Sequence, residues 1–244
     1  MSETLIINEI FLSLQGESTF AGLPCIFIRL TGCNLRCSYC DTTYAFAEGQ
    51  VKTIDEIEAR IQQLAQNYAA PASVGRLPLI ELTGGEPLLQ PGALPLLRRL
   101  CDHGYTVLLE TNGAVDIASV DPRVHRIVDL KCPSSGEGAH NRWENLAHLK
   151  VTDEIKFVIA THEDYLWAGQ TIRDYRLATL CPLLVSWAEP LPPSQPDAPL
   201  KTVPAYPTPM TRRELAERVL TDALPVRLQV QLHKIIWPPD TRGV

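Results

Sequence analysis

Residues 31–41 read Thr31-Gly32-Cys33-Asn34-Leu35-Arg36-Cys37-Ser38-Tyr39-Cys40-Asp41, and the three cysteines have the spacing C-x3-C-x2-C. Thiolates are soft ligands that select iron–sulfur clusters or zinc over magnesium and calcium. Three cysteines are one short of a four-cysteine site, so a 4Fe–4S cluster bound here would keep one iron without a protein ligand. The spacing therefore predicts chemistry at an open cluster.

Two other uses of these cysteines need weighing. A disulfide is disfavoured, because three close cysteines leave one unpaired and no export signal precedes them. A structural zinc site would need a fourth Cys or His at a matching spacing, whereas the other four cysteines occur singly, at Cys25, Cys101, Cys132 and Cys181. The spacing favours an iron–sulfur cluster and leaves a zinc site or a chance spacing as the alternatives.

A second motif lies downstream, at Glu81-Leu82-Thr83-Gly84-Gly85-Glu86-Pro87. Glycines let a backbone approach a ligand closely, and a carboxylate can hold an ammonium group. A Gly-Gly pair alone is an ordinary turn, but its position after the cysteines indicates a ligand site.

Apolar runs alternate with helical patterns along the chain. We expect buried strands at Cys25 to Leu30, Leu79 to Leu82, Thr106 to Glu110, Arg126 to Leu130, Glu154 to Ile159 and Leu180 to Val185. We expect helices after the capping boxes Thr53/Glu56 and Thr211/Glu214, the latter ending near Leu220, and also at Leu94 to Cys101, Arg142 to Leu149 and Glu163 to Asp174. This alternation predicts a parallel α/β fold and does not separate an open sheet from a barrel. The motifs follow strand ends, where ligands bind in such folds.

The composition suits one globular domain over residues 1–244, with 45% hydrophobic and 20% charged residues. A Pro-rich stretch at about 188–209 reads as an exposed insertion, because proline interrupts helices and interior strands. The net charge of −6 and the lack of a Lys/Arg run disfavour nucleic-acid binding. No signal peptide and no apolar run of ~20 residues is present, so we expect no membrane association and a reducing cytoplasm.

The cysteine motif, with the aromatic Tyr39 before its last cysteine, and the Gly-Gly-Glu-Pro motif together resemble the radical S-adenosylmethionine (SAM) superfamily. The resemblance implies a partial (β/α)6 barrel of TIM type. It also implies that the free iron chelates S-adenosylmethionine, whose reductive cleavage yields a 5′-deoxyadenosyl radical.

The flanking segments narrow the resemblance. Residues 8–22 contain Ser13-Leu14-Gln15-Gly16-Glu17, Asp41-Thr42 follows the cysteines, and residues 228–237 read LQVQLHKIIW. Together they resemble the 7-carboxy-7-deazaguanine synthase family over nearly the whole chain, except the Pro-rich stretch. That family of carbon–nitrogen lyases, in queuosine biosynthesis, converts 6-carboxy-5,6,7,8-tetrahydropterin to 7-carboxy-7-deazaguanine with loss of ammonia. The radical removes the hydrogen at C6 of the pterin, and S-adenosylmethionine is regenerated.

The resemblance also implies roles for individual residues. Cys33, Cys37 and Cys40 would bind the cluster, and Thr42 would bind Mg²⁺. Contacts to S-adenosylmethionine would come from Tyr39, Asp41, Gly85, Glu86, Asp129, Leu130, Lys131, Ser134 and Ser186. Contacts to the pterin would come from Leu14, Gln15, Gly16, Arg29, Thr83 and Val244, and Glu110 would act in catalysis by proton transfer or bind ribose.

Five of these roles have a structural alternative. Tyr39 could pack in the core, Asp41 could cap a turn, and Lys131 could be a surface residue. Arg29 could form a structural ion pair, and Glu110 could be a structural carboxylate. We interpret His233 as a structural histidine.

The family often has Gln-Gly-Glu-Gly where this chain has Gln15-Gly16-Glu17-Ser18, which leaves the loop path after Glu17 open.

One rival function is a radical activase acting on a partner protein, and another is a noncatalytic zinc-binding scaffold. The resemblance implies a flavodoxin or ferredoxin as electron donor and a homodimer.

Overall fold

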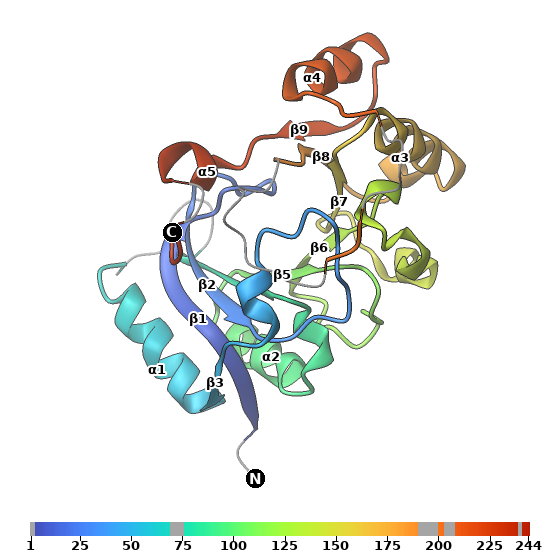
Figure 1. Cartoon of the computed structure of the whole chain (residues 1–244). Coiled ribbons are helices and arrows are strands. Elements are labelled where there is room, and N and C mark those ends of the chain that lie inside the picture. The colour runs from blue at the N-terminus through green and yellow to red at the C-terminus, as the bar shows by residue number, and fades with distance from the viewer. Residues whose placement is uncertain (1–2, 69–75, 190–199, 203–207, 239–240) are drawn as a thin grey trace.

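The computed structural model describes residues 3–68, 76–189, 200–202, 208–238 and 241–244 (Figure 1). Within these residues the strands form one sheet in the order β3-β1-β2-β4-β5-β6-β7-β8-β9. The strands are β1 (Thr4–Leu14), β2 (Pro24–Leu30), β3 (Gln50–Thr53), β4 (Leu79–Gly84), β5 (Val107–Thr111), β6 (His125–Asp129), β7 (Glu154–Ile159), β8 (Leu183–Trp187) and β9 (Arg227–Gln229). The α-helices are α1 (Ile54–Ala65), α2 (Ala93–Asp102), α3 (His162–Asp174), α4 (Arg212–Thr221) and α5 (Leu232–Ile236).

The sheet is parallel from β2 to β9, whereas β1 pairs antiparallel with both β2 and β3. The six expected strands are present as β2, β4, β5, β6, β7 and β8, so the predicted α/β class is confirmed and the sheet is consistent with a partial TIM-type barrel. Strands β1, β3 and β9 and the short helix α5 were not predicted.

Both predicted capping boxes are confirmed. The Thr53 hydroxyl accepts the backbone N–H of Glu56 at the start of α1, and Thr211 and Glu214 do the same for α4. The helix expected at Arg142 to Leu149 is wrong as an α-helix: a short 3-10 helix, η5 (Trp143–His148), lies there. Its Asn145 side chain donates to the carbonyls of Gly113 and Val115, which ties this turn to the loop after β5.

The sheet separates two apolar clusters. The larger one lies between the strands and the covering helices, with α1 packed on β1, α2 on β5 and α3 on β7. The smaller cluster lies on the opposite, inner face and comprises Cys25, Leu79, Leu108 and Ile127, with Phe20, Leu23, Phe27 and Leu77 against it. Side chains alternate along a strand, so residues two positions further on face the same side. On β4, β5 and β6 these are Glu81, Glu110 and Asp129, and polar groups therefore lie above the inner apolar cluster.

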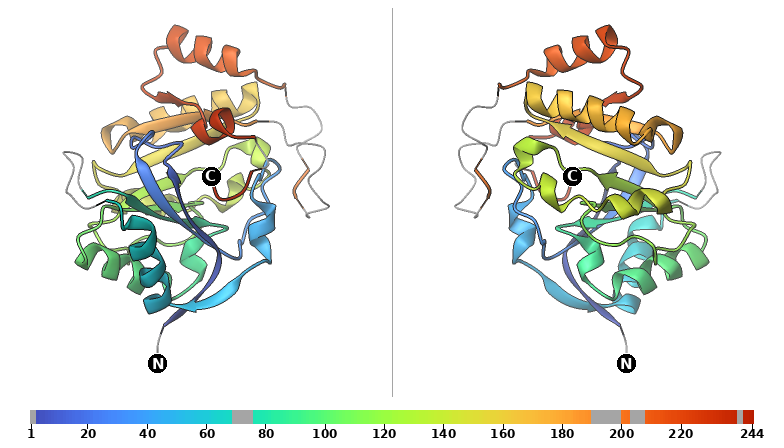
Figure 2. Two further views of the ribbon diagram at one scale, coloured as in Figure 1. Left: turned by 90° about the vertical axis from the view of Figure 1, so that its left-hand side faces the viewer. Right: turned by 90° about the vertical axis from the view of Figure 1, so that its right-hand side faces the viewer.

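Figure 2 shows the C-terminal end of the chain near the middle of the molecule, whereas the N-terminal end lies at its lower tip. Gly243 lies beside Phe11 of β1, which brings the C-terminal residues to the inner face of the sheet. No helix in the described part of the chain is long and apolar enough to span a bilayer. Most of the predicted insertion at 188–209 falls outside the described residues.

Candidate active site

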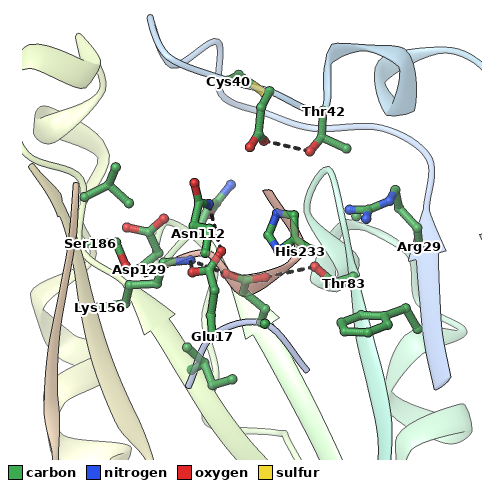
Figure 3. A pocket seen from close by; sticks show the side chains of 18 of the residues that line it. Glu17, Arg29, Cys40, Thr42, Thr83, Asn112, Asp129, Lys156, Ser186 and His233 are labelled. Carbon is green, nitrogen blue, oxygen red and sulfur yellow. Dashed lines mark hydrogen bonds and ion pairs between the residues drawn. The ribbon is translucent and has the colours of Figure 1, made fainter. Parts of the chain in front are cut away.

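A cavity of about 260 Å³ lies at the carboxyl ends of the parallel strands, between the cysteine loop and the segment that follows β1 (Figure 3). Of the residues proposed from sequence, it is lined by Leu14, Gln15, Gly16, Arg29, Cys33, Cys37, Tyr39, Cys40, Asp41, Thr42, Thr83, Gly85, Glu110, Asp129, Lys131, Ser186 and Val244. Glu86, Leu130 and Ser134 lie outside this lining. In Figure 3, Arg29 and Ser186 lie on opposite sides of the cavity, with Cys40 and Thr42 above it.

All three cysteines of the motif are free thiols at this cavity. Burial raises the pKa of Cys37, an effect that Lys131 opposes, and burial together with Asp41 raises the pKa of Cys40 to about 12. Among the described residues no three His, Cys, Asp or Glu side chains are grouped to hold one metal ion. A structural zinc needs its ligands around one point, whereas the cysteines of a cubane cluster each bind a different iron. Three thiols on one loop are the donor set of a cluster with one open iron, whereas a structural zinc site needs four ligands.

The glycine motif holds the start of the cysteine loop. Gly84 has a φ of +137°, and a Cβ on Gly85 would lie 2.0 Å from the carbonyl oxygen of Gly32. Next to them, the backbone N–H of Glu86 donates to the same carbonyl at 2.8 Å. Only glycine permits this close approach, so the pair brings the end of β4 directly against the cysteine loop.

Glu86 is fully buried, and its carboxylate already has protein partners. It accepts the backbone N–H of Leu88 at 3.0 Å, the backbone N–H of Asn112 at 2.7 Å and the hydroxyl of Thr111 at 2.9 Å. Burial raises the pKa of this carboxyl, and these donors oppose the shift. Glu86 thus joins the ends of β4 and β5, and its contact with S-adenosylmethionine stays a prediction.

The other two residues outside the lining are also engaged in the structure. Leu130 belongs to the larger apolar cluster and is 1% exposed. Ser134 donates its backbone N–H to Asp164 at 2.9 Å, and its carbonyl accepts the hydroxyl of Ser38. Ser134 therefore supports the far side of the cysteine loop, and cofactor contacts by either residue stay predictions.

The floor of the cavity carries four ionisable side chains, those of Glu17, Glu81, Glu110 and Lys156. The Lys156 ammonium pairs with Glu17 and lies 2.9 Å from Oε1 of Glu110. Burial lowers the pKa of Lys156, but the two carboxylates outweigh it and raise this pKa well above its usual value. Burial raises the pKa of Glu81 strongly, and nearby Glu110 and Glu17 add to the shift. This shift favours the protonated form of Glu81, whose Oε2 accepts from the side-chain amide of Gln15.

The opposite wall has buried polar atoms that lack partners within the described residues. They are the Tyr39 hydroxyl, the Ser186 hydroxyl and Oδ1 of Asp129. The second oxygen of Asp129 accepts from the Lys131 ammonium at 2.6 Å. A buried polar group without a partner is costly, so these atoms indicate a wall built to meet a polar ligand.

The structural ion pair that was the alternative role for Arg29 is present. Its Nε lies 2.8 Å from Glu9 while the residue lines the cavity, and this pair does not use its terminal nitrogens.

Burial favours the neutral form of Asp41, but Lys234 at 2.6 Å holds the pKa of Asp41 well below its usual range. The hydroxyl of Thr42 donates to Asp41 at 2.9 Å.

Sequence reasoning did not assign roles to Glu17, Glu81, Lys156 and Asn112, which all line the cavity. His233 also lines it and packs on Gly16, where a Cβ would meet its Nδ1 at 2.6 Å. A usable signal was present for two of them: Glu81 and Lys156 are charged residues within mainly apolar strands. A charged residue inside a buried strand faces either a partner or a ligand.

Comparisons with known proteins agree with this geometry. The family model described as the radical SAM superfamily matches residues 27–180. A 7-carboxy-7-deazaguanine synthase from Chlorobaculum tepidum is 46% identical, covering 98% of this chain and 97% of the relative. One from Koribacter versatilis is 45% identical, covering 98% and 99%. A crystal structure of QueE from Escherichia coli shares the fold with a TM-score of 0.64 at 23% identity, covering 93% of this chain and 94% of that chain.

Proposed function

The chain belongs to the radical SAM superfamily and, within it, to the 7-carboxy-7-deazaguanine synthase family, and we propose that it converts 6-carboxy-5,6,7,8-tetrahydropterin to 7-carboxy-7-deazaguanine with loss of ammonia. Family membership implies a 4Fe–4S cluster and S-adenosylmethionine. The observation that carries the proposal is the shared cavity: the cysteine loop and the residues expected to bind the pterin line the same space. The relatives are not named as activases, so that alternative is not favoured.

Cys33, Cys37 and Cys40 would hold the cluster, which supplies the electron for cleavage of S-adenosylmethionine when bound. The fit rests on three free thiols on one loop at a cavity, with N–H donors facing the Cys33 sulfur. The unpartnered atoms of Tyr39, Asp129 and Ser186 would then bind the polar groups of S-adenosylmethionine. Gly85, which lines the cavity beside the cysteine loop, would contact the methionine part, and Lys131 fixes one oxygen of Asp129.

The pterin would lie over the charged floor. Its edge presents donors and acceptors that the backbone of Leu14 and Gly16 and the amide of Gln15 can match. The Glu81 carboxyl accepts from the nitrogen of that amide, and the backbone N–H of Glu17 donates to its oxygen, so the amide is held in one orientation. Thr83 and the chain end at Val244 complete this side of the cavity.

The substrate carboxylate would pair with Arg29, whose planar fork suits it. Thr42 would bind Mg²⁺ together with that carboxylate, because oxygen donors are the ligands that this cation prefers. Glu110 would move the proton released during loss of ammonia. The Lys156 ammonium lies 2.9 Å from Oε1 of Glu110 and holds this carboxylate at the cavity.

Three further features belong to this proposal. A small reducing protein, a flavodoxin or ferredoxin, would supply the electron. Two copies of the chain would form a homodimer, and the protein would work in a reducing cytoplasm. These features follow from the family resemblance and from the expected sensitivity of the cluster to oxygen.

Equilibrium binding separates this proposal from the activase alternative. The cluster-loaded protein is titrated anaerobically with 6-carboxy-tetrahydropterin in the presence of S-adenosylmethionine, and Arg29→Gln is compared with the exposed Arg213→Gln. We expect saturable binding that Arg29→Gln weakens about tenfold or more, since a charge-assisted pair contributes about 1.5–3 kcal/mol, and that Arg213→Gln leaves unchanged. Lack of binding to a fully loaded protein would contradict the substrate assignment.

A further inference from the structure

Asn112 connects the glycine motif to the cysteine motif, although neither motif contains it. It follows the last residue of β5, is 7% exposed and lines the cavity. Its backbone N–H donates to Oε2 of Glu86 at 2.7 Å, and the preceding Thr111 hydroxyl donates to the same carboxylate. The backbone of Asn112 is therefore fixed by a fully buried side chain.

The contacts of the Asn112 side chain define which way its amide points. Oδ1 must face the backbone N–H of Ala114, from which it accepts at 3.0 Å. Nδ2 then faces the cysteine loop, where it donates to Oδ1 of Asn34 at 2.9 Å and toward the Cys33 sulfur at 3.8 Å. Figure 3 shows Asn112 projecting into the cavity from the strand ends.

The Cys33 sulfur thus has two N–H donors, because the backbone N–H of Leu35 lies 3.4 Å away. The backbone donor belongs to the loop itself and is common to any residue at that position. The side-chain donor comes from another strand and depends on an asparagine at position 112. Among the described residues, it is the hydrogen bond to this sulfur that a substitution outside the cysteine loop can remove.

Hydrogen bonds to cluster sulfurs are among the factors that set the reduction potential of an iron–sulfur centre. Reduction adds negative charge to the cluster and its thiolates, so an N–H donor stabilises the reduced form more than the oxidised form. We propose that Asn112 is a positioning residue that raises the reduction potential of the cluster by donating its side-chain N–H to the Cys33 thiolate. The inference rests on the cluster that the proposed function requires, and it does not depend on the pterin reaction.

The test is the midpoint reduction potential of the cluster in the reconstituted protein. It is measured without pterin by an anaerobic redox titration that is monitored by electron paramagnetic resonance. Asn112→Ala removes the donor, and the similarly sized Asn112→Asp replaces it with a negative charge. We expect both variants to have a lower potential than the wild type, with the larger shift for Asn112→Asp. A tenfold lower reduced-to-oxidised ratio at a fixed potential corresponds to a shift of about 59 mV.

Asn145→Asp is the matched control. Asn145 is buried and donates to the carbonyls of Gly113 and Val115, so this variant loosens the same loop without facing the cysteines. We expect its loaded cluster to keep the wild-type potential. Equal potentials in the wild type and both Asn112 variants would overturn the inference, as would the same shift in Asn145→Asp.

A second measurement does not require an Asn112 variant to fold. The Asn34→Ala variant is produced in cells supplied with asparagine that carries ¹⁵N in its side chain, so that Asn34 itself contributes no label. Its reduced cluster is then examined by pulsed hyperfine spectroscopy. We expect a ¹⁵N coupling, because Asn112 remains as a side-chain amide facing the sulfur. Its absence would overturn the inference. The proposed function would fail separately, if a loaded protein with this coupling made no 7-carboxy-7-deazaguanine.

Discussion

The Lys156 ammonium lies 2.9 Å from the carboxylate of Glu110 and also pairs with Glu17, beneath the cavity that the cysteine loop covers. Lys156 comes from the middle of β7 and is 7% exposed at its side chain. It is the cation that offsets the negative charges of Glu17 and Glu110 on this floor.

Replacing Lys156 with methionine should destabilise the protein. Removing one partner of a buried ion pair leaves uncompensated charge and costs about 3 kcal/mol or more. The exposed pair between Arg213 and Glu217 gives a control, since breaking it with Arg213→Ala should cost less than about 1 kcal/mol. Urea unfolding at pH 7 measures both. An equal loss of unfolding free energy in the two variants would show that the buried pair stabilises the protein no more than the exposed pair does.

The raised pKa of Glu81 predicts a pH dependence of stability. The pKa of Glu81 is higher in the folded protein than its ordinary value of 4.5. Above pH 4.5 the unfolded chain therefore releases a proton that the folded protein still holds. The contribution of Glu81 to stability therefore falls as pH rises from there toward the folded pKa. Glu81→Gln, which mimics the protonated form, should gain stability relative to the wild type as pH rises above that ordinary value. Urea unfolding at several pH values measures the difference, with the exposed Glu144→Gln as the control.

Gly85→Ala should prevent normal loading of the cluster. Its Cβ would lie 2.0 Å from the Gly32 carbonyl oxygen and 2.9 Å from the Cβ of Cys33, so the cysteine loop must shift. Gly169→Ala in α3 is the control, because the nearest atom to its new Cβ lies 3.5 Å away. Iron and sulfide per chain after reconstitution should fall several-fold only in Gly85→Ala. Full loading of that variant would contradict the packing argument.

Ser186→Ala should weaken binding of S-adenosylmethionine without destabilising the ligand-free protein. The Ser186 hydroxyl is buried without a partner in the described structure, so removing it costs no hydrogen bond. Ser134→Ala provides the contrast, because leaving Asp164 short of a donor costs about 1–3 kcal/mol. Thermal unfolding and a binding titration separate the two effects. A loss of stability in Ser186→Ala would show that its hydroxyl has a structural role.

Local patterns in the sequence predicted much of this structure. Apolar runs indicated the six parallel strands β2 and β4 to β8, and side-chain periodicity with capping residues indicated α1 and α4. The antiparallel strand β1 was missed because its run is interrupted by Asn8, Glu9 and Ser13. Strand β9 has only three residues, which is too short for a periodic signal.

The site was predictable where chemistry depends on neighbouring residues and not where it depends on distant ones. The cysteine spacing and the residues after each strand pointed to the cavity. The pairing of Lys156 with Glu17, and the contact of Asn112 with Cys33, join segments that only folding brings together. The hydrogen bonds that Thr111 and Asn112 donate to Glu86 likewise join segments that only folding brings together. The motif alone therefore does not show whether the Glu86 carboxylate has a structural role or binds a ligand.

The most direct test of the central claim is product formation by the reconstituted protein. The protein loaded with iron and sulfide is incubated anaerobically with S-adenosylmethionine, Mg²⁺, a reductant and 6-carboxy-tetrahydropterin, and 7-carboxy-7-deazaguanine is measured by mass spectrometry. We expect product from the wild type and from Cys101→Ala, whose cysteine lies in α2, and none from Cys37→Ala. If the wild type has a full cluster but yields only 5′-deoxyadenosine, the assigned substrate is wrong. If it yields neither compound, the assignment as a radical enzyme is contradicted.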